Sequence, residues 1–175
     1  MSLHPNHIKT TWLLIACIFI LLSGCARSKA EGFAIYLTKE DLAPNQMDAL
    51  SHVEPSDQPI ISLEDILSYD AETHEMELTD TAYERVLQME VPVTGISFLV
   101  CVDKAPLYWG AFWTPFSSLS FDGVTILTPL SSENPKIITL TLGYPAQSFY
   151  KGVDPRNNDT VFESLDKAGK LVNKR

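Results

Sequence analysis

Four strand-like segments follow one another between residues 96 and 143, and they constrain the possible fold more than any other feature. They are rich in β-branched and aromatic residues, and a proline lies near an end of each, where the missing ladder N–H does no harm. Only Lys104 to Pro106 separate the first two segments, which predicts a β-hairpin. The segments are 96–103 (ISFLVCVD), 107–114 (LYWGAFWT), 123–130 (GVTILTPL) and 136–143 (KIITLTLG).

Helical signals lie before and after this region. Ser62 and Asp65 have the spacing of a capping box in ISLEDILSYD, which predicts a short helix there. Thr79 is the expected cap of a second helix, DTAYERVLQM, and a third helix is expected over 160–171, capped by Asn158 or Asp159.

Two further strands are expected, at 33–38 (FAIYLT) and 74–78 (HEMEL). Helices therefore occupy the first half of the domain and its end, whereas strands dominate between them. The predicted fold class is α+β: a single small domain in which about three short helices pack on a mainly antiparallel sheet.

The first 32 residues differ in character from the rest. Trp12 to Leu22 is an uninterrupted apolar run of eleven residues, and the preceding MSLHPNHIKT is polar and weakly basic. A helix needs about 20 apolar residues to cross the hydrocarbon core of a membrane, whereas the apolar region of a secretory signal has about 7–15. The run is therefore expected to belong to a signal peptide.

Leu22-Ser23-Gly24-Cys25 resembles the lipobox of prokaryotic lipoproteins. The resemblance implies that Cys25 receives a diacylglycerol, that the chain is cut just before it, and that acyl chains such as palmitate hold the protein on the extracytoplasmic side of a membrane. In a Gram-negative host, Ala26 after the cysteine implies the outer membrane. A plain secretory signal or an uncleaved anchor is the alternative.

The implied organisation has three parts. Residues 1–24 are the lipoprotein signal peptide, residues 25–32 are the lipidated cysteine and a short polar tether, and residues 33–175 are one globular domain. A domain of this length can bury a sizeable core.

Acidic residues are concentrated in one half of the mature chain. Residues 40–90 hold fourteen acidic residues and one basic residue, Arg85, in a protein whose formal net charge is −9. Such a surface repels phosphate, so nucleic acid is not an expected partner. The acidic half is expected to be a solvated surface, and binding of a basic partner or of divalent cations is the alternative.

The densest chemical feature is the aromatic segment 107–114. Alternation along a strand places Trp109 and Trp113 on one face and Tyr108 and Phe112 on the other. The segment is either a strand covered on both faces or a platform for a ligand. Two indoles on one face of a strand would suit stacking on one sugar unit or its neighbour. These four aromatic residues are the candidate ligand-binding residues.

Two acidic loops contain potential metal ligands. Asp70, Glu72 and His74 alternate in YDAETHE, and Asp154 and Asp159 lie in DPRNNDT together with Asn157. The first lacks the paired histidines of a zinc site, and the second lacks the glycine and distal glutamate of an EF-hand. A turn and a helix cap explain the two loops, so no metal is expected.

Cys101 would be the one thiol left free after processing, because Cys17 leaves with the signal and Cys25 is acylated. No internal disulfide can then form. It lies in mid-strand with no cation beside it, which favours a buried, inert thiol. A nucleophile with His52 or His74 as base is the alternative.

The sequence contains neither a G-x-S-x-G elbow nor a phosphate-binding glycine loop, and no cofactor is expected. We therefore expect a membrane-anchored envelope lipoprotein that binds a glycan, a peptide or an envelope protein, and a binding role is favoured over an enzymatic one. One alternative is an envelope hydrolase acting through carboxylates, with Asp70, Glu72 and His74 as candidates. The other is a structural or assembly subunit of an envelope complex.

Replacement of Cys25 by alanine is expected to abolish lipidation, because no other group at that position can form a thioether. The measurement is metabolic labelling with an alkyne fatty acid in a bacterial host, followed by in-gel fluorescence. Cys17→Ala is the matched control, since Cys17 precedes the expected cut, and it should label normally. Normal labelling of Cys25→Ala would contradict the assignment.

Overall fold

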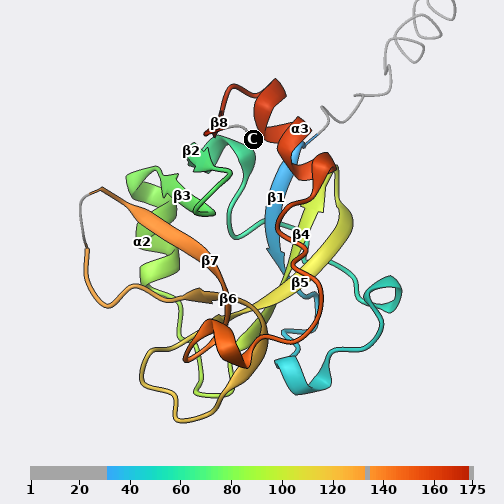
Figure 1. Cartoon of the computed structure of the whole chain (residues 1–175), viewed down its shortest axis with the longest axis vertical. Helices are drawn as coiled ribbons and strands as arrows, with labels where there is room; N and C mark the ends of the chain where they lie inside the picture. Colours follow the sequence, from blue (N-terminus) through green and yellow to red (C-terminus); the bar gives the residue numbers. More distant parts are fainter. Residues whose placement is uncertain (1–30, 133–134, 174–175) are drawn as a thin grey trace, which may run out of the picture.

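The computed structural model describes residues 31–132 and 135–173 (Figure 1). The lipobox, Cys25 and the predicted signal peptide lie outside the described residues. Within the described part, eight strands form one sheet in the order β1-β4-β5-β6-β7-β3-β2-β8. The strands are β1 (Phe33–Leu37), β2 (Ile66–Asp70), β3 (Glu75–Leu78), β4 (Ile96–Val102), β5 (Ala105–Trp113), β6 (Phe121–Leu127), β7 (Ile137–Tyr144) and β8 (Leu171–Val172).

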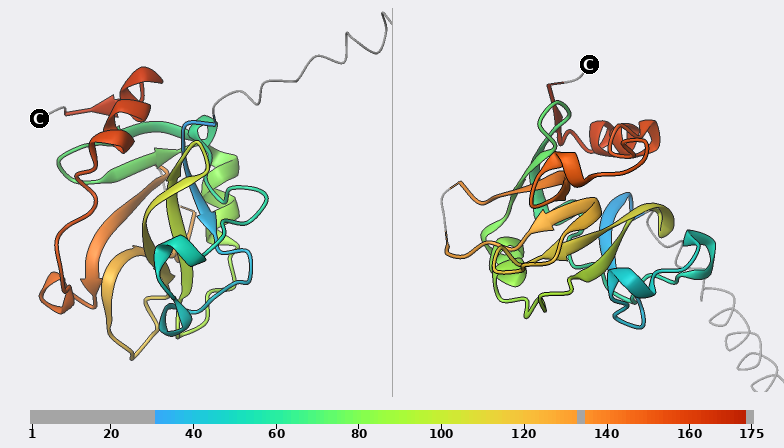
Figure 2. Two further views of the ribbon diagram at one scale, coloured as in Figure 1. Left: turned by 90° about the vertical axis from the view of Figure 1, so that its right-hand side faces the viewer. Right: turned by 60° about the horizontal axis from the view of Figure 1, so that its bottom comes forward.

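The sheet is mainly antiparallel, as predicted. Among the strand pairs of the described part, only β5–β6 and β2–β8 run parallel. The sheet is strongly curved, so that its two ends approach each other across the interior (Figure 2). Backbone hydrogen bonds between Ile35 and Ile61 cover part of the outer edge of β1, which is thereby protected from pairing with another chain.

Two α-helices occur in the described residues, α2 (Asp80–Leu87) and α3 (Asp159–Lys167). Both predicted caps are confirmed. The Thr79 hydroxyl accepts a hydrogen bond from the Ala82 amide, and the Asn158 side chain accepts from the amides of Thr160 and Val161. Each cap satisfies amides that a helix start leaves without an intrahelical acceptor.

The predicted helix in ISLEDILSYD is wrong. Its capping pair does form, since the Ser62 amide donates to the Asp65 carboxylate at 2.8 Å, but it closes only the 3₁₀ turn η3 (Leu63–Asp65). The chain then continues as β2, whose Ile66 and Tyr69 are fully buried. Pairing with β3 and β8 thus outweighs the local helical signal, and the count of three α-helices is corrected to two for the described residues.

The predicted hairpin is confirmed as β4 and β5, but its turn is shorter than expected. Asp103 and Lys104 both have positive φ, 53° and 65°, as a two-residue hairpin turn of the primed type requires. Ala105 and Pro106 already pair with β4. The two later predicted strands are confirmed as β6 and β7.

The main core lies on the concave side of the sheet and is completed by α2 and α3. Its largest buried side chains include Phe33, Tyr69, Tyr83, Phe98 and Phe112. A smaller cluster on the opposite face of β1 and β4 contains Tyr36, Leu99 and Cys101. The strands at this end of the sheet are therefore covered on both faces. None of the described helices has the length and apolar composition needed to cross a bilayer.

Gly110 in β5 is expected to tolerate no side chain. A Cβ atom there would lie 2.3 Å from the Val124 carbonyl oxygen and 2.5 Å from the Phe98 ring. Gly110→Ala should therefore lower the free energy of unfolding by about 2 kcal/mol, measured by urea denaturation. Glu75→Ala, at an exposed strand position, is the control and should change it by less than about 0.5 kcal/mol. Equal effects of the two substitutions would contradict the close approach.

Candidate functional site

The strand β5 sends its aromatic side chains to two different environments. Tyr108 and Phe112 point into the main core, where they are 6% and 0% exposed. Trp109 and Trp113 lie on the opposite face, where Trp109 is partly exposed. The predicted alternation is confirmed, but burial withdraws Tyr108 and Phe112 from any ligand surface. Trp113 is itself only 3% exposed, so Trp109 is the one of the four candidates that is substantially accessible.

Phe121 lies against both indoles. Its ring stacks on Trp113 at 5.2 Å with an interplanar angle of 11°, and it lies 5.9 Å from the Trp109 ring at 53°. Tyr144 adds a tilted contact with Trp113 at 5.9 Å. The aromatic face that was expected as a ligand platform is thus partly covered by the protein's own Phe121. The contact of Phe121 with the indoles was not predicted, because Phe121 starts the next strand. It reaches Trp109 and Trp113 only through the parallel pairing of β5 and β6.

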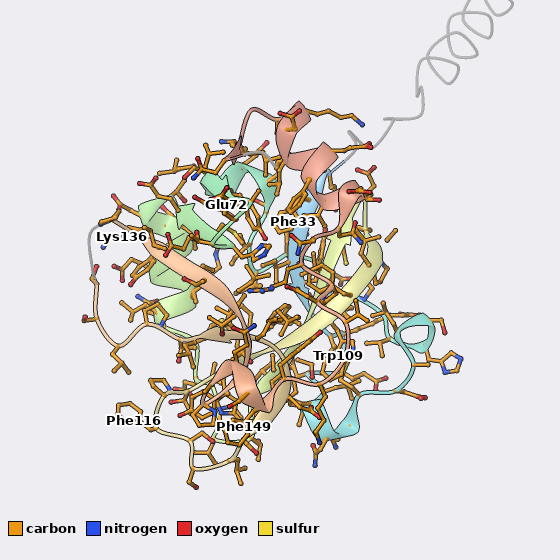
Figure 3. The ribbon with its side chains drawn as sticks, viewed as in Figure 1. Phe33, Glu72, Trp109, Phe116, Lys136 and Phe149 are labelled. Carbon is orange, nitrogen blue, oxygen red and sulfur yellow. The ribbon has the colours of Figure 1, made fainter. Side chains whose placement is uncertain are left out.

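A hollow of about 400 Å³ opens beside this aromatic cluster. Its lining combines aromatic rings, a proline and a leucine with amide, hydroxyl and carboxylate groups. In the view of Figure 3, Trp109 lies below Phe33 and above Phe149. The lining residues are Pro44, Asn45, Thr94, Trp109, Trp113, Leu119, Ser120, Phe121 and Asp122.

Trp113 lines the hollow but is only 3% exposed, and its indole N–H finds no acceptor within the described part of the chain. A buried N–H without an acceptor costs free energy, because folding removes its hydrogen bond to water. The same face of the sheet buries the Ser97 hydroxyl, which also lacks a described partner. This side of the sheet therefore carries aromatic side chains and two buried polar groups that lack a hydrogen-bond partner among the described residues.

The loop 114–120 forms one lip of the hollow and is held firmly. The Tyr144 hydroxyl lies 3.1 Å from the carbonyl oxygens of both Pro115 and Ser117. The Ser117 hydroxyl donates to the Val93 carbonyl at 2.7 Å. Phe116 is nevertheless 77% exposed, so a large apolar side chain is presented to solvent from a fixed backbone.

Phe116 belongs to a larger region that we call the uncharged end, made of residues 91–95, 114–120 and 145–149. None of these residues is charged, and Val93, Leu119 and Phe149 are also substantially exposed. Phe116 and Phe149 lie together at the end of the molecule away from Phe33 (Figure 3). An exposed apolar area on an otherwise acidic protein is typical of an interaction surface.

The first predicted set of oxygen and imidazole ligands does not come together. Asp70 accepts hydrogen bonds from the amides of Glu72 and Thr73 in a turn, and these bonds lower the pKa of its carboxyl. Glu72 points to solvent, whereas His74 is buried with positive φ, and its Nδ1 lies 3.0 Å from the Tyr69 hydroxyl. In the ranges that the structure describes, no three such residues are grouped as metal ligands would be.

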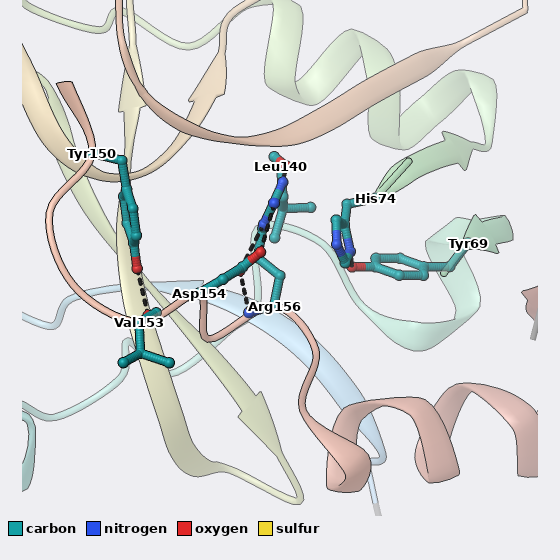
Figure 4. Close-up of polar contacts among 7 residues, drawn as sticks. All are labelled: Tyr69, His74, Leu140, Tyr150, Val153, Asp154 and Arg156. Carbon is teal, nitrogen blue, oxygen red and sulfur yellow. Dashed lines mark hydrogen bonds and ion pairs between the residues drawn. The ribbon is translucent and has the colours of Figure 1, made fainter. Parts of the chain in front are cut away.

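The second set is also separated by the fold. Asp154 forms a two-pronged pair with Arg156, with Nε–Oδ1 at 2.9 Å and Nη2–Oδ2 at 2.8 Å, while Asp159 starts α3. Arg156 also donates to the Leu140 carbonyl at 2.6 Å, which attaches the segment before α3 to β7 (Figure 4). The sequence showed only that Asp154 and Arg156 are close in the chain, whereas the fold buries most of the Arg156 side chain.

Cys101 is fully buried in β4, and burial raises the pKa of its thiol to about 12. A thiol with so high a pKa is protonated at neutral pH and is a poor nucleophile. His52 lies on the surface beside Asp48. The expected burial of the Cys101 thiol is therefore confirmed.

Comparison with protein-family models, with curated proteins and with solved structures finds no match to this chain. Function must therefore be argued from the chain's own residues.

Asp154→Asn should destabilise the fold in a pH-dependent way. The hydrogen bonds from Arg156 hold the pKa of the Asp154 carboxyl below its usual value. The stabilisation is therefore fully present above the unfolded pKa of about 3.9 and is lost as the pH falls through the lower folded value. We expect a loss of about 1–2 kcal/mol at pH 7 that shrinks below about pH 4, measured by urea denaturation across pH.

Asp159→Asn, at an exposed position, is the matched control, and we expect no comparable effect on stability at pH 7. A constant difference between wild type and Asp154→Asn from pH 7 to pH 3 would contradict the role of this ion pair.

Proposed function

We propose that this protein is a lipid-anchored lipoprotein of the cell envelope, and that its domain binds a ligand or partner instead of catalysing a reaction. The observation that carries the proposal is the aromatic hollow together with the uncharged end. Both are preformed surfaces for an uncharged ligand, on a protein that is otherwise strongly acidic.

The position of these surfaces supports the proposal. Seven residues, 26–32, separate Cys25 from the start of β1, and they span at most about 24 Å when extended. Figure 1 shows the start of β1 in the upper part of the domain, and Figure 3 shows Phe116 and Phe149 of the uncharged end at the bottom in the same view. A domain attached through Cys25 would then present the uncharged end away from the membrane, where a partner can reach it.

The three residues considered as candidates for hydrolysis are poorly placed for catalysis. His74 lies in the interior beside Tyr69, while the carboxylates of Asp70 and Glu72 face other directions. General acid–base catalysis requires such groups to converge on one substrate position. The arrangement favours binding over turnover.

A second role, as an assembly subunit, is favoured by one separate observation. Phe116 is a rigidly presented apolar side chain, and residues of this kind often anchor protein–protein interfaces. In this role the uncharged end would dock on another envelope protein.

Cysteine labelling tests the location and the occupied surface together. A lipidated Cys25 and the buried Cys101 leave no reactive thiol, so Ser118→Cys reports on the uncharged end and Ser51→Cys on the acidic side. We expect a membrane-impermeant maleimide to label both variants in spheroplasts. Relative to the purified protein, labelling in cells should be several-fold slower at position 118 than at position 51, because a bound ligand or partner shields it.

Labelling only after lysis would contradict the extracytoplasmic location. Equal slowing at the two positions would contradict the uncharged end as the binding surface.

A further inference from the structure

We propose that the hollow beside Trp109 binds an uncharged sugar residue of a glycan. This inference rests on the proposed binding function and adds the chemical class of the ligand. It rests on the aromatic rings and the polar groups that line the hollow, on the charge of this lining, and on the pairing of the strand that forms its wall.

The aromatic side of the hollow suits a sugar ring. Trp109 is partly exposed, and its ring is supported from the side by Phe121, which in turn stacks on Trp113. A pyranose has an apolar face of C–H groups that packs on an aromatic ring. Because these rings are already held by one another, binding would cost little side-chain entropy.

The polar groups suit the edge of the same ring. Asn45, Thr94, Ser120 and Asp122 supply an amide, two hydroxyls and a carboxylate around the rings. A sugar has an apolar face and hydroxyls at its edge, so it can satisfy both parts of the hollow at once.

The charge of the hollow narrows the ligand class. Asp122 is the one charged residue among those that line it in the described chain, and no lysine or arginine lines it. Lys151 lies 3.9 Å from Asp122, but both side chains are largely exposed, so their attraction is weak. Phosphorylated sugars and uronic acids would therefore meet a carboxylate without a compensating cation, whereas neutral sugars would not.

The strand pairing disfavours an extended peptide in the same place. Peptides often bind by adding a strand to an open sheet edge. From Gly110 to Phe112, β5 is paired on one side with β4 and on the other with β6, so this part of the wall offers no open edge. The volume of about 400 Å³ lies near the lower end of the roughly 300–1,000 Å³ found for ligand pockets, which suits a short saccharide.

The test is isothermal titration calorimetry on the whole protein, purified from membranes in lauryldimethylamine oxide, a detergent without a sugar head group. The probes are the N-acetylglucosamine trimer, maltotriose, cellotriose and, as an anionic comparison, trigalacturonic acid. We expect at least one neutral trimer to bind with a dissociation constant below about 1 mM, and the anionic trimer to bind at least tenfold more weakly.

Two variants locate the site. Trp109→Ala should weaken the neutral trimer at least tenfold, and Trp109→Phe, which keeps a ring and guards against a folding defect, should restore most of the affinity. Val153→Ala is the matched control, since Val153 is 91% exposed and does not line the hollow, and it should bind like the wild type.

Absence of binding by all three neutral trimers would overturn the sugar assignment. So would binding that Trp109→Ala leaves unchanged, or tighter binding of the anionic trimer. None of these outcomes affects the cysteine-labelling test of the proposed function. Shielding at position 118 without any sugar binding would retain a binding lipoprotein and reject only the glycan, whereas failure of shielding would reject the uncharged end as the binding surface.

Discussion

The structure depends on the burial of β5 from both sides. Phe112 and Tyr108 pack into the main core, while Trp109 and Trp113 form a second apolar layer with Phe121 on the opposite face. Gly110 between them lets the Val124 carbonyl and the Phe98 ring approach the backbone. The strand therefore joins two apolar layers, and the hollow lies at the edge of the outer one.

A second constraint holds the end of the chain on this sheet. The Arg156 guanidinium donates two hydrogen bonds to the Asp154 carboxylate and one to the Leu140 carbonyl of β7. The segment that leads into α3 is therefore attached to the sheet at a largely buried point. Nearby, His74 and the Tyr69 hydroxyl lie together in the interior, and burial raises the pKa of that hydroxyl above its ordinary value. Polar groups that looked like surface ligands in the sequence thus stabilise the junction between β2, β7 and α3.

Strands and helix caps were predictable because their signals are local. The residues of β1, β4, β5 and β7 show apolar and β-branched patterns, and Thr79 and Asn158 cap the helices that their positions predict. The helix expected after Ser62 does not form, because β2 is stabilised by pairing with strands distant in sequence. One of these pairs joins Tyr69 to Leu171, near the other end of the chain. Of the candidate site, the shared face of Trp109 and Trp113 was predictable, but Phe121 and the loop held by Tyr144 were not.

The sequence by itself determined the strand content, the hairpin, the caps and the acidic character, since each depends on neighbouring residues or on composition. It also predicts the lipid anchor at Cys25, which lies outside the described residues. Only the tertiary structure decided which aromatic residues are accessible. Strand alternation separates two faces, but the pairing of β5 with β6 brings Phe121 onto the indoles, and this pairing joins segments whose contact no local pattern specifies.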